Sequence, residues 1–346
     1  MVDKLLKFLL LISPLAFTAG IQPDKFELMF FHFGAIALFM ASLLDIPKRD
    51  NIPIAKEIVL FFGLCIFSTA IHSFQMFSMG ELLNLFFSCI TLNLIYRYMS
   101  NPKTYYKYIT WAVGINIGIY LLQKYYFNFL PFKDLGEVNG GVFGTTCRMA
   151  NYLAITAPII ITPLLFIIPV ISIILNQFPA IGVVAMLFII KQTTKKDYYG
   201  SHIFKLVIAA IVSGIIGFLI YFRGHILTSI KSRIFDSGKM QIAEICKAPF
   251  IGHGLGAYYS QVGNDPFNTY LAFVYDVGIL GLVLIGYVLY NIRKYFDLSI
   301  PSLSLITLLV VSTIEYPIEI PRLWFTILFI IAAFFIKEKE PENASS

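Results

Sequence analysis

Charged residues are scarce in this sequence. They make up 13% of its 346 residues, whereas a soluble domain carries about 25%. So small a supply cannot cover a water-facing surface around a chain that is 58% hydrophobic. Short polar clusters separate apolar runs of about 20 residues, the length that crosses the core of a bilayer. The composition argues against a soluble globular protein and predicts an all-α, polytopic transmembrane helical bundle.

Cysteine is also sparse, and its four copies form no metal-binding pattern. The sequence has no CxxC pair and no histidine at ligand spacing from a cysteine, so no zinc site is predicted. Cys65 and Cys89 lie in apolar runs and are interpreted as small core residues. Cys147 and Cys246 fall in predicted external loops, where a disulfide between them stays an open alternative.

Five apolar segments in the N-terminal part predict five spans, at residues 5–21, 26–44, 54–72, 82–99 and 105–127. The connection 45–56 and the one after residue 99 are rich in lysine and arginine, whereas 22–25 and 73–81 are poor in them. Short cytoplasmic loops collect these residues, so the N-terminus is predicted to be cytoplasmic. The first helix is expected to be retained, because Phe17 spoils a signal-peptide cleavage site before Ala19.

Four prolines interrupt the next apolar stretch and would break a continuous helix there: Pro158, Pro163, Pro169 and Pro179. Lys191, Lys195 and Lys196 place the following loop in the cytoplasm. We therefore expect three short or broken spans, followed by four more, at residues 149–161, 164–175, 179–190, 204–222, 269–290, 303–314 and 323–336. The prediction is a single integral membrane domain, 1–346, with about twelve helices and both termini cytoplasmic.

Two predicted external loops have an unusual composition. Residues 127–148 are rich in glycine and end at Arg148, shortly before Asn151. Residues 223–266 form a large periplasmic loop with five basic residues, Arg223, Lys231, Arg233, Lys239 and Lys247. Either these cations face an anion such as a phosphate, or they are merely solvated, since long loops escape the positive-inside rule. Arg148 has an alternative role as an anchor at the membrane boundary.

A glycine-rich pattern ends the large loop and is followed by the next helix. The pattern is Pro-x-x-Gly-x-Gly-x-Gly, and no strand precedes it, so a Rossmann site is excluded. Its residues, with the histidine inside it and the positions that follow, are Pro249, Gly252, His253, Gly254, Gly256, Asn268, Tyr270, Gly278 and Gly281. Earlier in the chain stand Phe143, Gly144, Asn151 and Ala154, then Gly238 and Lys239. In this order, over residues 140–281, the chain resembles the O-antigen ligase and O-antigen polymerase superfamily of bacterial membrane glycan enzymes.

The resemblance implies a metal-independent membrane glycosyltransferase without cofactors, at the outer face of the bacterial inner membrane. It would polymerise polyprenyl-pyrophosphate-linked oligosaccharide repeat units of O-antigen or capsule type, as in lipopolysaccharide biosynthesis. The implied partners are the glycan donor, a glycan acceptor, the lipid bilayer and a chain-length regulator. Nucleic acid is not expected as a partner, because the net charge of +6 is small and lies in loops.

The site residues follow from the same resemblance and from the loop charges. The expected catalytic residues are Arg148, Arg233, Lys239 and His253. The expected substrate-binding residues are Asn151, Gly252, Gly254, Gly256, Asn268, Tyr270 and Arg322. Arg322 has an alternative role in an ion pair with Glu315 or Glu319, which share its hairpin. No DxD-type carboxylate pair stands in an external loop, so no metal is predicted.

Two other functions stay open. Phe267 stands where ligases of the superfamily carry a histidine before asparagine, and Lys239 stands where arginine is usual. The first departure favours a polymerase over a ligase that transfers glycan to lipid A-core or to protein. A secondary transporter would also suit about twelve helices with broken spans. It should show mid-membrane charges and repeat symmetry between the halves, and the sequence offers little of either.

Overall fold

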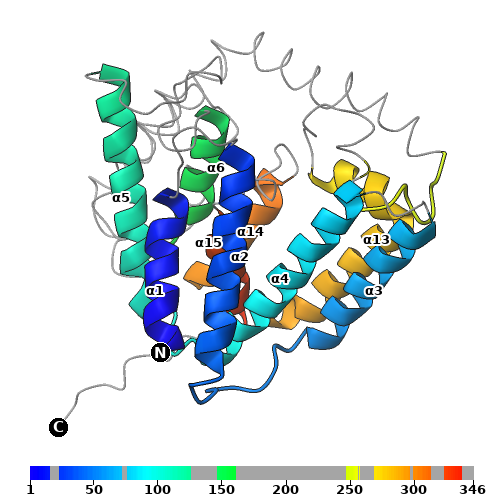
Figure 1. Ribbon diagram of the computed structural model, residues 1–346, viewed down its shortest axis with the longest axis horizontal. Coiled ribbons are helices and arrows are strands. Elements are labelled where there is room, and N and C mark those ends of the chain that lie inside the picture. The colour runs from blue at the N-terminus through cyan, green and yellow to red at the C-terminus, as the bar shows by residue number, and fades with distance from the viewer. Residues whose placement is uncertain are drawn as a thin grey trace, which may run out of the picture.

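The computed structural model describes residues 1–15, 23–71, 76–125, 146–160, 247–255, 257, 269–296, 299–312 and 323–336. All regular structure in these ranges is helical, with nine α-helices and two short 3-10 helices (Figure 1). The all-α class is therefore confirmed for this part of the chain. Most of the predicted loop 223–266 and the predicted spans 164–175, 179–190 and 204–222 lie outside the described residues.

The N-terminal helices follow the apolar runs of the sequence. They are α1 (Val2–Ile12), α2 (Pro23–Ser42), α3 (Ala55–Ile71), α4 (Met76–Tyr98) and α5 (Lys103–Tyr125), with the 3-10 helix η1 (Ser13–Leu15) after α1. Their bounds agree with the predicted spans to within a few residues, with two exceptions: α4, which begins at Met76 instead of residue 82, and α1. That helix changes to 3-10 geometry where Pro14 occurs, because proline lacks the N–H that an α-helical turn needs.

The later part of the chain has one long helix, α13, and three short ones. They are α6 (Thr146–Thr156), α13 (Thr269–Ile292), α14 (Ile300–Val311) and α15 (Trp324–Phe334), with the 3-10 helix η5 (Arg293–Tyr295) after α13. Helix α6 begins before the predicted residue 149 and stops short of residue 161. Its end precedes Pro158, which cannot donate the next helical hydrogen bond.

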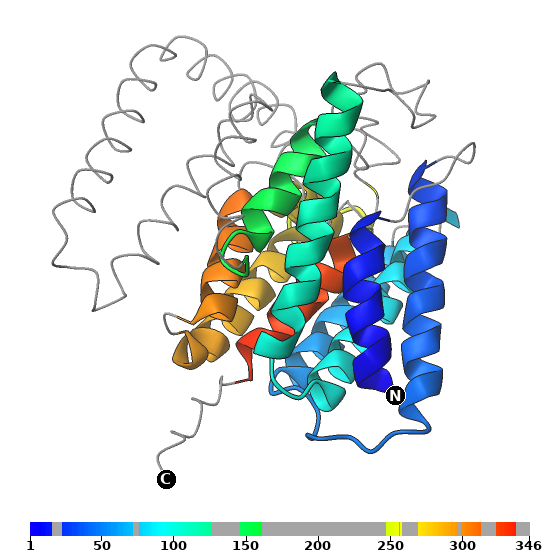
Figure 2. The same cartoon turned by 90° about the vertical axis from the view of Figure 1, so that its left-hand side faces the viewer.

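The described helices run between two ends of the bundle (Figures 1 and 2). At one end the N-terminus lies beside the connection 43–54, because the Met1 ammonium is 2.6 Å from the Asp45 carboxylate. That connection also lies across the end of α4, where the Lys48 N–H donates to the Arg97 carbonyl over 2.8 Å. We call this the basic end, since it gathers Lys4, Lys7, Lys48, Arg49, Lys56, Arg97, Lys103, Lys107, Arg293 and Lys294. The starts of α6 and α13 lie at the opposite end.

Helix α4 lies inside the bundle, packed against α2, α3 and α15. Helix α2 approaches α15 closely at Gly34, where a Cβ atom would stand 2.6 Å from the ring of Phe325. Next to it, Phe31 meets the rings of Trp324 and Phe325 at centroid distances of 4.7 and 5.1 Å. A small residue that admits a large ring is a common way for helices to pack in membranes.

Large apolar side chains are exposed on several helices, and some polar side chains are buried. Phe33, Val59 and Val283 are 64%, 71% and 62% exposed on α2, α3 and α13. Asn116 and Thr307 are fully buried, and each donates to a carbonyl one turn earlier in its own helix. Two described helices, Met79–Tyr98 and Ala272–Tyr295, are long and apolar enough to cross a membrane.

Candidate functional site

Helix α13 is broken at Gly278. This residue has φ 73° and ψ −173°, a conformation that only glycine adopts without strain. The break separates the carbonyls of Tyr275 and Asp276 from the N–H groups of Ile279 and Leu280. Groups at helix ends have no partner within the helix and must find one elsewhere.

The turn formed by residues 247–255, here called the glycine turn, supplies those partners. The His253 and Gly254 N–H groups donate to the carbonyls of Tyr275 and Asp276 over 2.9 and 3.0 Å. In the other direction, the Ile279 and Leu280 N–H groups donate to the carbonyls of Pro249 and Phe250 over 2.9 and 3.2 Å. The glycine turn thus closes both sides of the break. In hydrocarbon, each backbone group left unpaired would cost several kcal/mol.

Two glycines allow the glycine turn and α13 to approach closely enough for these hydrogen bonds. A Cβ atom on Gly252, which has φ 77°, would lie 2.4 Å from the Asp276 carbonyl. A Cβ atom on Gly278 would lie 2.4 Å from the Phe250 carbonyl, and each such atom would lie 2.6 Å from the nitrogen of the other glycine. The glycine pattern seen in the sequence therefore brings two stretches of backbone together. Its two described members, Gly252 and Gly254, line a contact within the protein.

Helix α3 holds the other side of the glycine turn. The Ser68 hydroxyl oxygen lies 2.7 Å from the Ile251 carbonyl and 3.0 Å from the Asp276 carbonyl. The Leu255 N–H donates to the Thr69 hydroxyl oxygen over 3.1 Å. Sequence reasoning missed both hydroxyl residues, although a Ser-Thr pair in an apolar run was a visible signal. Helix α3, the glycine turn and α13 form one hydrogen-bonded unit.

His253 has a defined orientation in this unit. Its ring stacks on Tyr275 at a centroid distance of 4.3 Å and an interplanar angle of 14°. Its Nδ1 lies 3.2 Å from the Tyr275 carbonyl oxygen. That contact is a hydrogen bond when Nδ1 carries the proton, which makes Nε2 the lone-pair nitrogen of the neutral ring. The half-buried imidazole could therefore accept a proton at Nε2.

Arg148 and Asn151 lie on α6, which packs against α14. Asn151 is buried, with 4% of its surface exposed, and Arg148 is half-buried. The end of α14 also meets the start of α13, because the Tyr270 hydroxyl donates to the Leu309 carbonyl over 3.1 Å. Helix α14 thus connects α6 with the beginning of α13. Tyr270 holds this junction.

Five of the expected site residues lie outside the described residues: Arg233, Lys239, Gly256, Asn268 and Arg322. The alternatives that involve Glu315, Glu319 and a disulfide to Cys246 lie outside them as well. Within the described ranges, no three histidine, cysteine, aspartate or glutamate side chains gather as a metal site.

Ionisable side chains within the helices were underestimated from the sequence. Asp276 is 8% exposed and immediately precedes the break in the apolar helix α13. Glu81 hydrogen-bonds Asn84 on α4, and the Asn84 Oδ1 atom is 2.8 Å from Nε2 of His32 on α2. Such residues are costly in membrane helices and usually functional. Each is an ionisable residue in or beside an apolar run of the sequence, and that position is the signal that could have identified it.

A scan against protein-family models finds no match to this chain, and no curated protein matches it. The interpretation of the site therefore depends on the residues and contacts described above.

Proposed function

We propose that the chain is a multi-pass protein of the bacterial inner membrane with its basic end in the cytoplasm. Outward-facing apolar side chains, buried hydroxyl residues and two membrane-length helices support a lipid environment. The gathering of lysine and arginine at one end of the bundle supports the orientation. The glycine turn and the start of α6 then face the outer side.

The proposed activity is a glycosyltransferase that polymerises polyprenyl-pyrophosphate-linked oligosaccharide repeat units, of O-antigen or capsule type. The observation that carries this proposal is the contact of the glycine turn with the break at Gly278. This contact joins the Pro-x-x-Gly-x-Gly segment to the Gly-x-x-Gly segment, two separate parts of the pattern that resembles the polymerases. A contact between them supports the interpretation that they are one motif.

In the proposed reaction, a hydroxyl of the acceptor sugar attacks the anomeric carbon of the donor glycan. The bond from that carbon to the pyrophosphate oxygen breaks, and its electron pair leaves with polyprenyl pyrophosphate. Arg148, Arg233 and Lys239 would stabilise the charge on the leaving group. The Nε2 atom of His253 would accept the hydroxyl proton. The leaving group already supplies the activation, so the protein positions the reactants.

A secondary transporter is the second candidate, and the break in α13 favours it. Discontinuous helices line the substrate sites of many carriers and present unpaired backbone groups to the substrate. Here the Tyr275 and Asp276 carbonyls and the Ile279 and Leu280 N–H groups all bond to the glycine turn. Since the break is closed by the protein itself, the polymerase is the better-supported function. A ligase stays the alternative within the same chemistry.

The decisive experiment compares surface glycan in a Gram-negative host before and after deletion of the gene. A polymerase deletion leaves lipid A-core capped by one repeat unit, and this is the expected result. A ligase deletion leaves bare core with long chains on the polyprenyl carrier. Complementation with Arg148→Ala should fail at normal protein abundance, whereas Lys294→Ala, which changes an exposed lysine at the basic end, should restore long chains. Unchanged surface glycan would contradict both enzymes and favour the transporter.

A further inference from the structure

The connection 43–54, at the basic end, exposes large apolar side chains. Leu43, Leu44 and Ile46 are 65%, 77% and 83% exposed, and all three lie within four residues of the sequence. They stand next to Lys48, which is also exposed. Exposed apolar clusters of this kind mark interaction surfaces.

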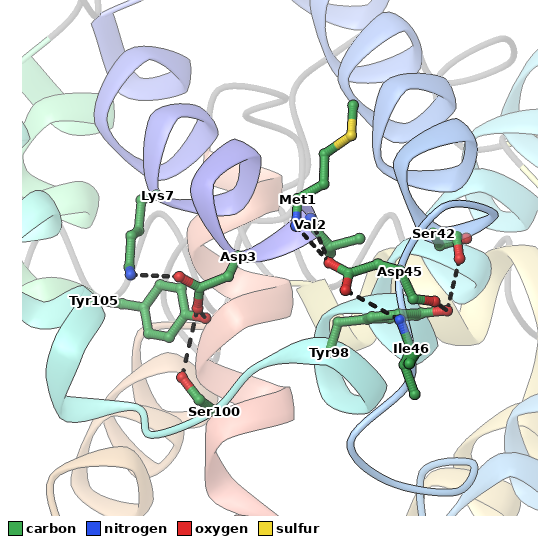
Figure 3. Close-up of polar contacts among 10 residues, drawn as sticks. All are labelled: Met1, Val2, Asp3, Lys7, Ser42, Asp45, Ile46, Tyr98, Ser100 and Tyr105. Carbon is green, nitrogen blue, oxygen red and sulfur yellow. Dashed lines mark hydrogen bonds and ion pairs between the residues drawn. The ribbon is translucent and has the colours of Figure 1, made fainter.

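The exposure does not come from a loose loop, because the connection is tied down along its length (Figure 3). The Asp45 carboxylate accepts hydrogen bonds from the Met1 ammonium and the Val2 N–H over 2.6 and 3.0 Å. The Ile52 N–H donates to the Asn93 side chain over 3.1 Å. Between these anchors, the Arg49 guanidinium donates to the carbonyls of Met99 and Ser100 at the end of α4. A loop held this firmly presents its apolar residues to whatever surrounds that end of the bundle.

The charge around the loop favours an anionic partner. Of the acidic residues in and beside it, Asp45 is paired with the Met1 ammonium and Asp3 with Lys7, and Asp50 is exposed. Lysine and arginine outnumber aspartate and glutamate more than two to one among the described residues of the basic end. Apolar side chains next to an excess of cations suit a membrane surface that contains anionic lipid. The apolar side chains can contact the acyl chains, and the cations can contact the anionic headgroups.

We propose that the connection 43–54 lies in the headgroup layer of the cytoplasmic leaflet and binds an anionic phospholipid. Leu43, Leu44 and Ile46 insert toward the acyl chains, and Lys48 contacts the lipid phosphate. This inference depends on the proposed membrane orientation, but it does not depend on the proposed glycosyltransferase activity.

The test uses the full-length protein in phosphatidylcholine vesicles with and without phosphatidylglycerol. An environment-sensitive fluorophore is attached to Ile46→Cys or, as the control, to the exposed loop position Asp50→Cys, in a background without the native cysteines. The probe at 46 should be shielded from aqueous iodide, and the probe at 50 should be quenched. Equal quenching at both positions would overturn the inference. Protein that fails to stay with the vesicles would instead overturn the membrane location itself.

A second measurement needs no cysteine-free background. Added phosphatidylglycerol should raise the unfolding temperature of the detergent-solubilised protein more than phosphatidylcholine does. Lys48→Gln should weaken the apparent affinity for phosphatidylglycerol about fivefold, the effect expected for one lysine near an anionic surface. Lys247→Gln removes an exposed lysine at the opposite end and should leave the affinity unchanged. An equal effect of the two variants, or no preference for the anionic lipid, would overturn the lipid site.

Discussion

The Ser68 hydroxyl oxygen lies 3.0 Å from the carbonyl oxygen of Asp276, a residue 208 positions later in the chain. The same hydroxyl oxygen lies 2.7 Å from the Ile251 carbonyl. One side chain of α3 therefore touches both the glycine turn and the end of the first half of α13. Ser68→Ala should lower the free energy of unfolding by about 1 kcal/mol, the usual net value of one hydrogen bond. Denaturation in detergent would measure this, and a variant as stable as wild type would contradict the bridging role.

Substitution of the two facing glycines should disrupt the fold locally. In Gly252→Ala or Gly278→Ala the new methyl group would meet backbone at 2.4 Å, and the left-handed conformation adds about 1–2 kcal/mol. We expect each variant to be poorly abundant in the membrane. Gly286→Ala is the matched control, because open space surrounds Gly286 in the same helix. It should be neutral or stabilising by up to about 1 kcal/mol, and a similar loss in all three variants would contradict the packing argument.

His253 allows chemistry to be separated from packing. His253→Phe keeps an aromatic ring to stack on Tyr275 but has no nitrogen to accept a proton. We expect this variant to reach normal abundance and to lose glycan extension by about 10²-fold or more, the lower range for general-base catalysis. Extension would be measured as the chain length of the surface glycan, as for the deletion strain. Normal extension in His253→Phe would exclude this histidine as the base.

Asn84 should matter for stability because it connects two ionisable side chains. Asn84→Ala leaves Glu81 and His32 without the amide that both contact. Leaving buried polar groups unpaired costs about 1–3 kcal/mol, so the unfolding temperature should fall clearly. Ser88→Ala serves as the control, because Ser88 donates only to the Asn84 carbonyl in its own helix. Equal effects of the two substitutions would contradict a special role for the Glu81–Asn84–His32 contact.

The ion pair at the basic end should make stability depend on pH. The hydrogen bond from the Met1 ammonium holds the pKa of Asp45 below its usual value, and the Val2 N–H adds to this effect. A carboxylate with a lowered folded-state pKa stabilises the protein above its unfolded pKa of about 3.9, and this stabilisation is lost as the pH falls through the folded pKa. Wild type should therefore unfold at a higher temperature than Asp45→Asn at pH near 6. The difference should shrink below about pH 4 and in high salt; a difference that persists in acid would contradict the assignment.

The sequence predicted the helices better than it predicted the site. Long apolar runs predict helices, and the predicted spans 26–44, 54–72 and 105–127 agree with α2, α3 and α5. The break at Gly278 was not predicted, because a single glycine in a helix is tolerated and gives no local signal. The break is associated with a contact to Gly252 across the fold, and the periodicity of the local sequence does not reveal such a contact.

The residues that resemble the glycan polymerases were found from their order in the sequence, and their structural roles were not. Gly252 and Gly278 stand in separate parts of the sequence pattern, but they face each other in the fold. A Cβ atom added to either glycine would lie 2.6 Å from the nitrogen of the other. Asp276 was overlooked because one acidic residue barely changes the mean hydropathy of its helix. For Arg233, Lys239, Gly256, Asn268 and Arg322, the assignment stays a prediction from the sequence.

The hydrogen-bond partners that close the break in α13 are synthesised in a particular order. The residues that cap its break, Ser68 in α3 and Pro249 to Gly254 in the glycine turn, are synthesised before Gly278. When the two halves of α13 leave the ribosome, every partner for their unpaired backbone groups has therefore already been made. The break in α13 can therefore be closed without waiting for any segment that follows this helix in the chain.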